Sequence, residues 1–199
     1  MKNNKTHIIL ASNSPRRKQL LSLLDVKYDI VPPNVDEKGI TINSIPSEYC
    51  QNLAKLKAES ICNQYPKSLI IGADTIVVLN DKIIEKPTDK SEAIEMLEYL
   101  SGNTHQVYTG IALLCVEQNI DVVFYEKTDV SFNNLTESDI NYYIENYAPY
   151  DKAGSYGIQD WGASFVKSIN GCYYNVVGFP VSKFLQNLRK LVINITFLL

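Results

Sequence analysis

The sequence predicts an α/β protein, because short apolar strands alternate with amphipathic helices along its 199 residues. Residues 8–11 are apolar and typical of a buried strand, and the polar turn at residues 12–14 leads from them into a helix. A second apolar, β-branched stretch follows at residues 69–79, and residues 107–116 and 120–132 form the longest β-rich runs. A chain of this length buries roughly 70% of its unfolded surface, in one core or in two lobes around a cleft.

Ser14 and Pro15 fix the start of the first helix. Serine is a preferred N-cap residue, and proline fits the first helical position because its missing N–H has no intrahelical partner there. Leu20, Leu21 and Leu24 are expected on the inner face of this helix. The free N–H groups of the first turn then point back at the serine turn.

Arg16 and Arg17 follow directly, in the first turn of the helix, where positive charges oppose the helix dipole. A bound anion, such as a phosphate chain, would resolve this conflict. The alternative is a capped surface helix whose arginines are solvated, and the residues alone leave both interpretations open.

Residues 27–31 predict a second short strand, and the loop after it carries Asp36, Glu37 and Lys38, by default a solvated charged loop. Pro46 then begins a helix. Its expected apolar stripe consists of Tyr49, Leu53, Leu56 and Ile61. Lys57 lies at the edge of that stripe, from which it either extends to solvent over a packed stem or reaches into a cleft between lobes.

Asp74 is the second informative residue, because it lies within the apolar stretch of residues 69–79. The small and polar residues 72–75 are expected to interrupt this strand. A buried carboxylate without a partner costs several kcal/mol, so Asp74 needs a cation, a set of donors or a water-filled cleft. It either anchors a bulge or acts as a catalytic or metal-binding carboxylate.

Turns and caps predict the remaining elements. Residues 82–85 return as a hairpin strand ahead of Lys86, Asp89 caps a helix, and Thr136 opens another. A glycine-rich loop is expected at residues 151–162. After it we expect a second hairpin, with strands at residues 165–169 and 172–177, and then a helix that begins at Pro180.

Composition narrows the function classes. A formal net charge of −3 argues against nonspecific binding to nucleic acid or to acidic membranes. Four isolated cysteines and two histidines make a zinc site unexpected and indicate a reducing compartment. No signal peptide or membrane span is expected, so the predicted location is the cytoplasm. Neither a dinucleotide-binding glycine motif nor a Walker motif is present.

Six motifs together resemble one family across nearly the whole chain. They are ASNSPRR, GADT, EKP, LSGNTHQVYTG, DKAGSYGIQ and VVGFP. In this order they resemble the Maf nucleoside triphosphate pyrophosphatases. The resemblance implies a single domain over residues 1–199, with a mixed twisted sheet, flanking helices and two lobes around a central cleft, as in the ITPase-like fold. It also implies hydrolysis of a nucleoside triphosphate to the monophosphate and pyrophosphate with a divalent metal (Mg²⁺, Mn²⁺ or Co²⁺), and often a homodimer.

The site residues that the resemblance implies are taken position by position. Those matching the phosphate-binding groups are Ser12, Ser14, Arg17, Lys57 and Lys86. The acidic pair tied to metal and catalysis is Glu37 and Asp74, with Asp74 as proton acceptor. Phosphate chemistry suits this combination, because cations offset the charge on the phosphoryl group while a carboxylate activates water.

Three further residues match the branch of the family that acts on dTTP and UTP. They are Arg16, Thr75 and Gln159. A physical argument also supports Gln159 as a residue that recognises the base. Uracil and thymine present an N–H between two carbonyl oxygens, and a carboxamide offers both a donor and an acceptor. Asp160 and Trp161 follow where the family usually has a glycine and a small or variable residue, a departure at the rim of the expected base pocket.

The leading hypothesis is thus a metal-dependent dTTP/UTP pyrophosphatase, acting also on modified pyrimidine triphosphates. One alternative is a nucleotide-binding regulator of cell division and septum formation in which turnover is incidental. Another is a generic phosphatase, which would also hydrolyse monophosphates.

Overall fold

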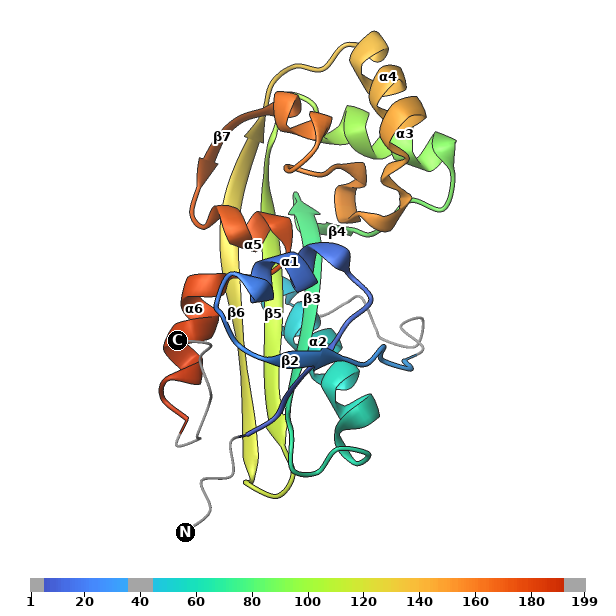
Figure 1. Cartoon of the computed structure of the whole chain (residues 1–199). Helices are drawn as coiled ribbons and strands as arrows, with labels where there is room; N and C mark the ends of the chain where they lie inside the picture. The colour runs from blue at the N-terminus through green and yellow to red at the C-terminus, as the bar shows by residue number, and fades with distance from the viewer. Residues whose placement is uncertain (1–5, 36–44, 192–199) are drawn as a thin grey trace. The chain divides into compact units, whose positions relative to one another are not determined.

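A mixed sheet of seven strands organises the computed structural model, which describes residues 6–35 and 45–191 (Figure 1). The strands are β1 (Ile8–Ala11), β2 (Tyr28–Ile30), β3 (Leu69–Leu79), β4 (Lys82–Ile84), β5 (Thr104–Cys115), β6 (Ile120–Phe132) and β7 (Val166–Asn170). The α-helices are α1 (Pro15–Ser22), α2 (Pro46–Cys62), α3 (Lys90–Leu100), α4 (Glu137–Tyr147), α5 (Tyr173–Val177) and α6 (Val181–Leu188). The strand order is β2-β1-β3-β5-β6-β7, with β4 paired to β3, which confirms the predicted α/β class and mixed sheet.

The chain divides into two compact units. The first consists of Met1–Asp74, Thr109–Glu126 and Gly178–Leu199, and the second of Thr75–Tyr108 and Lys127–Val177. Strands β3, β5 and β6 each contribute residues to both units.

In the first unit, β1 is parallel to both of its neighbours, β2 and β3. Helix α1 connects β1 to β2, and α2 lies between β2 and β3 in sequence, so two βαβ connections build this part of the sheet. The predicted cap of α1 is confirmed, because the Ser14 side chain accepts a hydrogen bond from the Arg17 backbone N–H. Leu20 and Leu21 are buried as expected, whereas α1 ends before Leu24, which is half-buried.

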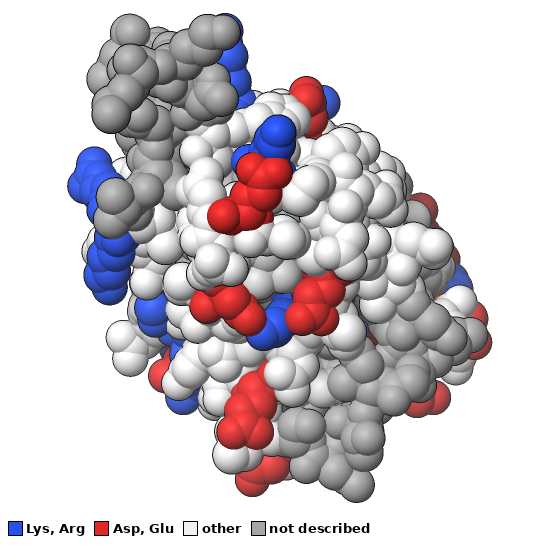
Figure 2. Space-filling model, turned by 90° about the horizontal axis from the view of Figure 1, so that it is seen from below, with Lys and Arg blue, Asp and Glu red and all other residues white. Residues whose placement is uncertain are grey.

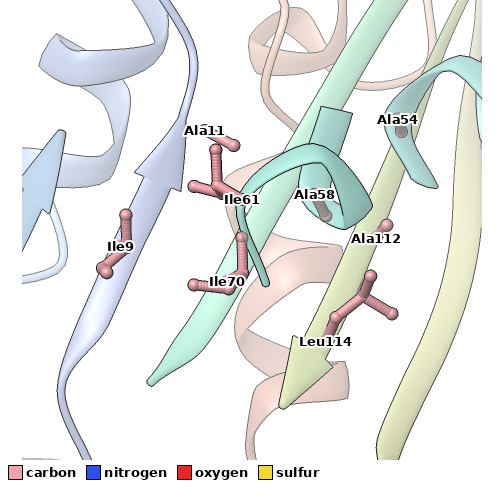
Figure 3. Close-up of a cluster of buried hydrophobic side chains, with 8 residues drawn as sticks. All are labelled: Ile9, Ala11, Ala54, Ala58, Ile61, Ile70, Ala112 and Leu114. Atoms are coloured by element: carbon pink, nitrogen blue, oxygen red, sulfur yellow. The ribbon is translucent and has the colours of Figure 1, made fainter. Parts of the chain in front are cut away.

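Helix α2 packs closely against the sheet of the first unit because small residues line the contact. A Cβ atom added at Gly72 on β3 would overlap the Ala54 carbonyl oxygen, and one added at Gly110 on β5 would overlap the Cys50 carbonyl oxygen. The side chains at this contact form one hydrophobic cluster, shown in Figure 3: Ile9, Ala11, Ala54, Ala58, Ile61, Ile70, Ala112 and Leu114. Glycine on the strands and alanine on the helix thus set the distance between the two layers.

One detail of α2 corrects the sequence-based prediction. Tyr49, Leu53 and Ile61 are buried as expected, but Leu56 is 37% exposed and Lys57 is only 6% exposed. The face of α2 turned toward the sheet therefore includes a charged residue in place of the expected leucine, because Lys57 has an acidic partner on β3.

Strand β3 also differs from the prediction, since it continues through residues 72–75 without the expected interruption. Residues i and i+2 of a strand point to the same face, so Ile70, Gly72 and Asp74 all face the layer that α2 covers.

In the second unit, the predicted turns and caps are largely confirmed. Strand β4 pairs antiparallel with β3, as expected for the hairpin. The Asp89 side chain caps α3 by accepting from the Glu92 N–H, and Thr136 with Asp139 forms a capping box at the start of α4.

The second hairpin predicted for residues 165–177 is wrong in its second half. Strand β7 forms but pairs antiparallel with β6, and residues 173–177 are helix α5. The helical turn lets the buried Asn175 amide donate to the Val107 carbonyl oxygen and to the Thr128 hydroxyl, each over 2.9 Å. A short apolar run is ambiguous between strand and helix, and these tertiary hydrogen bonds decide for helix.

Charged side chains of both signs are interspersed among the described residues on the face in Figure 2. Several form exposed ion pairs, such as Lys55 with Asp121 at 2.6 Å. Pairs of this kind contribute at most about 1 kcal/mol each. No helix among residues 6–35 and 45–191 has both the length and the apolar character to cross a membrane.

His105 is a titratable group in the core of the second unit, with no exposed surface. Its Nε2 atom shares a hydrogen bond of 2.8 Å with the Tyr156 hydroxyl, and its ring packs edge-on against Phe132. Burial lowers the pKa of His105 to about 4, so the imidazole is neutral at pH 7.

We expect Gly72→Ala to lower the free energy of unfolding by about 1–3 kcal/mol, because a backbone carbonyl of α2 occupies the space that the new methyl group needs. Urea denaturation measures the change. Lys67→Ala, whose side chain is 81% exposed, is the control and should stay within about 0.5 kcal/mol. An unchanged urea midpoint for Gly72→Ala would contradict the close packing of α2 on β3.

The buried His105 predicts a loss of stability in mild acid. The unfolded chain binds a proton near pH 6.5 and the folded chain near pH 4, so stability is complete above pH 6.5 and falls as the pH drops toward 4. The loss attributable to this residue is on the order of 3 kcal/mol.

To isolate this contribution, unfolding of the wild type and of His105→Gln is compared between pH 7 and pH 4. The difference in their free energies of unfolding should shrink as the pH falls, because only the wild type loses the histidine contribution. His7→Gln, at the exposed histidine, is the control. A constant difference for His105→Gln would contradict a neutral buried imidazole.

Candidate functional site

The serine turn after β1 leads directly into the capped start of α1. The Ser12 hydroxyl oxygen accepts a hydrogen bond from the Ser14 N–H over 3.1 Å, and the Ser14 hydroxyl in turn caps α1. Pro15 occupies the first helical position, as predicted. The turn and the first residues of an eight-residue helix thus form a ready anion-binding geometry, the predicted role of Ser12 and Ser14.

Arg17 is oriented by a part of the chain distant in sequence. Its Nε atom donates a hydrogen bond of 3.0 Å to the Gly178 carbonyl oxygen, and its Nη1 atom lies 3.5 Å from the Ser12 hydroxyl oxygen. Gly178 has a φ of +119°, a conformation that favours glycine. Gly178 belongs to the VVGFP motif, to which the sequence analysis gave no role in the site. The glycine before Phe179 and Pro180 was the signal in the sequence that could have indicated a special backbone conformation here.

The Asp74 carboxylate lies 2.6 Å from the Lys57 ammonium, and both side chains are about nine-tenths buried. An ion pair this short and this buried is strongly oriented by its charge-assisted hydrogen bond. Lys57 therefore does not extend to solvent, one of the two interpretations that the sequence left open. Asp74 has the cation that its burial requires.

The parallel register of β1 and β3 brings these two parts of the site together. Ala11, the last residue of β1, pairs with Gly72 on β3. Ser12 therefore follows at the level of the residue between Gly72 and Asp74, and adjacent strands lie about 4.8 Å apart. The serine turn and the Lys57–Asp74 pair thus stand at the carboxyl end of β1, the usual location of ligand sites in parallel sheets.

Cys50 lies one turn before Ala54 on α2 and is fully buried. Burial, and then the negative charge of Asp74, raise the pKa of the Cys50 thiol to about 12. The thiol is therefore protonated at neutral pH and cannot act as a nucleophile.

The second unit carries the remaining predicted residues that the structure describes. Lys86 is exposed just after β4, Thr75 is half-buried on β3, and Gln159 is exposed on the glycine-rich loop. The Gly154 N–H donates to the Glu85 carbonyl oxygen over 3.0 Å, which ties this loop to the segment that carries Lys86.

The structure brings the predicted residues together in two sets. In the first unit these are Ser12, Ser14, Arg16, Arg17, Lys57 and Asp74. Thr75, Lys86 and Gln159 belong to the second unit. Glu37, predicted as the partner of Asp74 in binding metal, lies outside the described residues. Within the described parts of the chain, no three His, Cys, Asp or Glu side chains gather as a metal site.

The fold places the chain in a class of known proteins. It is similar to that of a HAM1 protein from Coxiella burnetii, with a TM-score of 0.52 and 16% sequence identity, over 94% of this chain and all of that one. Residues 7–191 match the model of the Maf-like protein family, and the chain belongs to the Maf family. The resemblance found in the six motifs is thereby confirmed.

Two relatives within this family are close in sequence. A protein of Bacillus cereus named dTTP/UTP pyrophosphatase is 46% identical over 189 residues, which cover 95% of this chain and 97% of the relative. A protein of the same name from Bacillus cytotoxicus is 48% identical over 182 residues, covering 92% of this chain and 94% of the relative.

The Lys57–Asp74 pair predicts a large effect of removing one partner. Lys57→Met leaves a buried carboxylate without its cation, so the free energy of unfolding should fall by about 3–5 kcal/mol, and Lys57→Met with Asp74→Leu should recover most of it. Chemical denaturation measures both.

The control is Lys55→Met on the same helix, since Lys55 forms an equally short pair with the exposed Asp121 and should lose at most about 1 kcal/mol. Equal losses for Lys57→Met and Lys55→Met would contradict the role given to burial.

Proposed function

We propose that this protein hydrolyses dTTP and UTP to the nucleoside monophosphate and pyrophosphate. The observation that carries the proposal is the buried Lys57–Asp74 pair next to the serine turn, because a carboxylate beside an anion site can activate water for attack on a bound phosphoanhydride. The names of the Bacillus relatives support the choice of substrates.

In this proposal the triphosphate binds at the N-terminus of α1. The positive end of the helix dipole, the hydroxyls of Ser12 and Ser14, and the Arg17 guanidinium attract and bind phosphate oxygens. The contact between Arg17 and Gly178 fixes the plane of the guanidinium before the substrate arrives, which lowers the entropy cost of binding. Lys57 and Lys86 supply further positive charge.

Asp74 is the proposed proton acceptor. As the oxygen of a water molecule forms a bond to the α-phosphorus, the carboxylate takes the water's proton, and the bond from the α-phosphorus to the bridging oxygen breaks. The electron pair of that bond leaves with pyrophosphate. Lys57 holds the carboxylate in one orientation through its 2.6 Å contact, so the acceptor atom is in place before the water attacks.

A divalent cation fits this site only with help from the substrate. Among the described residues no three His, Cys, Asp or Glu side chains could together hold a metal ion, and Mg²⁺ is commonly held by one or two carboxylates together with substrate phosphates and water. We propose that Asp74 and Glu37 hold Mg²⁺, Mn²⁺ or Co²⁺ with triphosphate oxygens. The cation would neutralise negative charge on the phosphoryl group.

Arg16, Thr75 and Gln159 are the proposed determinants of base specificity. A glutamine carboxamide donates through its nitrogen and accepts through its oxygen, which complements a carbonyl and the adjacent N–H of uracil or thymine. Cytosine presents the reverse pattern, with an acceptor nitrogen and an amino donor, which a carboxamide held in the same orientation cannot complement.

Asp74→Asn tests the proposed chemistry. Asparagine keeps the size of the side chain but cannot accept the water's proton, so kcat for pyrophosphate release from dTTP with Mg²⁺ or Mn²⁺ should fall by about 10²- to 10⁴-fold. The dissociation constant for dTTP should change much less. Product analysis by chromatography must show dTMP and pyrophosphate.

Asp121→Asn is the matched control, because Asp121 forms an equally short pair with a lysine of α2 but lies at the surface. Its activity should equal that of the wild type. Wild-type activity in Asp74→Asn would contradict the role of the carboxylate, and release of orthophosphate by the wild type would contradict the proposed bond cleavage.

A further inference from the structure

A buried tyrosine fixes the loop that carries Gln159. Tyr143 on α4 has no exposed surface, and its hydroxyl donates a hydrogen bond of 2.9 Å to Asp160 Oδ1. The same hydroxyl accepts a hydrogen bond of 2.9 Å from the Gly157 N–H. Burial and the Asp160 charge raise the pKa of Tyr143, so its hydroxyl keeps its proton.

Asp160 holds the loop from its other side. Its Oδ1 atom also accepts from the Gly162 N–H over 2.9 Å, and its Oδ2 atom lies 3.8 Å from the ammonium of Lys152. We call the group Tyr143, Gly157, Asp160 and Gly162 the Tyr143–Asp160 clamp. Both carboxylate oxygens are thus engaged within the second unit, and the loop is attached to α4 at two residues.

There is little room for the clamp to shift. A Cβ atom added at Gly157 would lie 2.5 Å from Asp160 Oδ2, and one added at Gly162 would lie 2.7 Å from the Gly157 carbonyl oxygen. Trp161 adds an aromatic layer, with its ring stacked on that of Tyr143 at 6.1 Å and packed edge-on against Phe165 at 5.3 Å. The backbone on either side of Gln159 is therefore tightly constrained.

Only Ile158 and Gln159 lie between the two clamped residues Gly157 and Asp160. Ile158 is 8% exposed and faces the interior, whereas Gln159 is exposed. Between the two clamped residues, Gln159 is therefore the one polar side chain that projects from a constrained backbone.

We propose that Tyr143 and Asp160 are positioning residues that set base selectivity by fixing Gln159. The inference rests on the proposed function, in which Gln159 contacts the base. Selectivity is a difference between two affinities, and a carboxamide on a mobile loop can rotate or shift to match the cytosine pattern. On a fixed loop the side chain can still turn about its own torsions, but the carboxamide cannot shift as a whole without breaking the clamp, so the rigid loop penalises a base whose polar groups lie elsewhere.

Tyr143→Phe tests the proposal, because it removes one hydroxyl and keeps the aromatic stack. The ratio of kcat/KM for UTP to that for CTP should fall about tenfold, mainly through a higher KM for UTP, since the lost hydroxyl removes the acceptor of the Gly157 N–H and one of the donors to Asp160. Amide hydrogen exchange at residues 157–162 should become faster in the protein without nucleotide. Unchanged exchange and an unchanged ratio would overturn the proposal.

Two further variants separate positioning from a general loss of structure. Tyr147→Phe on the same helix is the matched control, because Tyr147 stacks on Tyr143 but its ring is partly exposed, and its ratio should equal that of the wild type. Asp160→Asn keeps an acceptor oxygen and should retain more selectivity than Asp160→Ala. Equal loss in these two Asp160 variants would contradict the hydrogen-bonding role.

Gln159→Ala distinguishes failure of this inference from failure of the proposed function. If the clamp acts through Gln159, Tyr143→Phe should not lower the ratio further in a Gln159→Ala background. A wild type without preference for UTP, or a Gln159→Ala variant with full preference, would overturn the proposed base recognition and the inference with it. Selectivity that depends on Gln159 but not on Tyr143 would overturn the inference alone.

Discussion

The buried ion pair between Lys57 and Asp74 is the interaction on which the arrangement of the first unit depends. Two charges withdrawn from water must face each other closely, so α2 has to lie near β3 and in one rotation about its axis. Gly72 and Gly110 make this approach possible because neither strand presents a Cβ atom to the helix backbone. The same contact that packs the core therefore sets the geometry of the carboxylate.

Parallel strand pairing adds the second half of the site. Because β1 and β3 run in the same direction, the turn that follows β1 lies at the level of Asp74, although some sixty residues separate the two in sequence. The turn then supplies two serine hydroxyls at the positive end of the α1 dipole. A carboxylate beside an anion-binding turn is an unfavourable juxtaposition unless cations are present, and Lys57 and Arg17 provide them.

Both units use a distant polar group to fix a side chain that is proposed to meet the substrate. In the first, the Gly178 carbonyl oxygen orients Arg17, and in the second, the Tyr143 hydroxyl constrains the backbone on both sides of Gln159. The contact to Arg17 comes from a backbone carbonyl, and the contacts to the loop come from a buried tyrosine. Neither contact takes up the space where the substrate is proposed to bind. Preorganisation of this kind uses contacts formed on folding to lower the entropy cost of binding the substrate.

The sequence by itself determined most of the strands and helix starts and the family, because caps such as Ser14 and Asp89 and apolar runs act through neighbouring residues. It also predicted the site residues by motif, Glu37 among them, which lies outside the described residues. Only the tertiary structure decided that Lys57 rather than Leu56 is buried and that residues 173–177 are helical, as well as which groups orient Arg17 and constrain the backbone around Gln159. These outcomes depend on contacts with residues that are distant in sequence. Local propensity reflects only neighbouring residues, so it cannot predict such contacts.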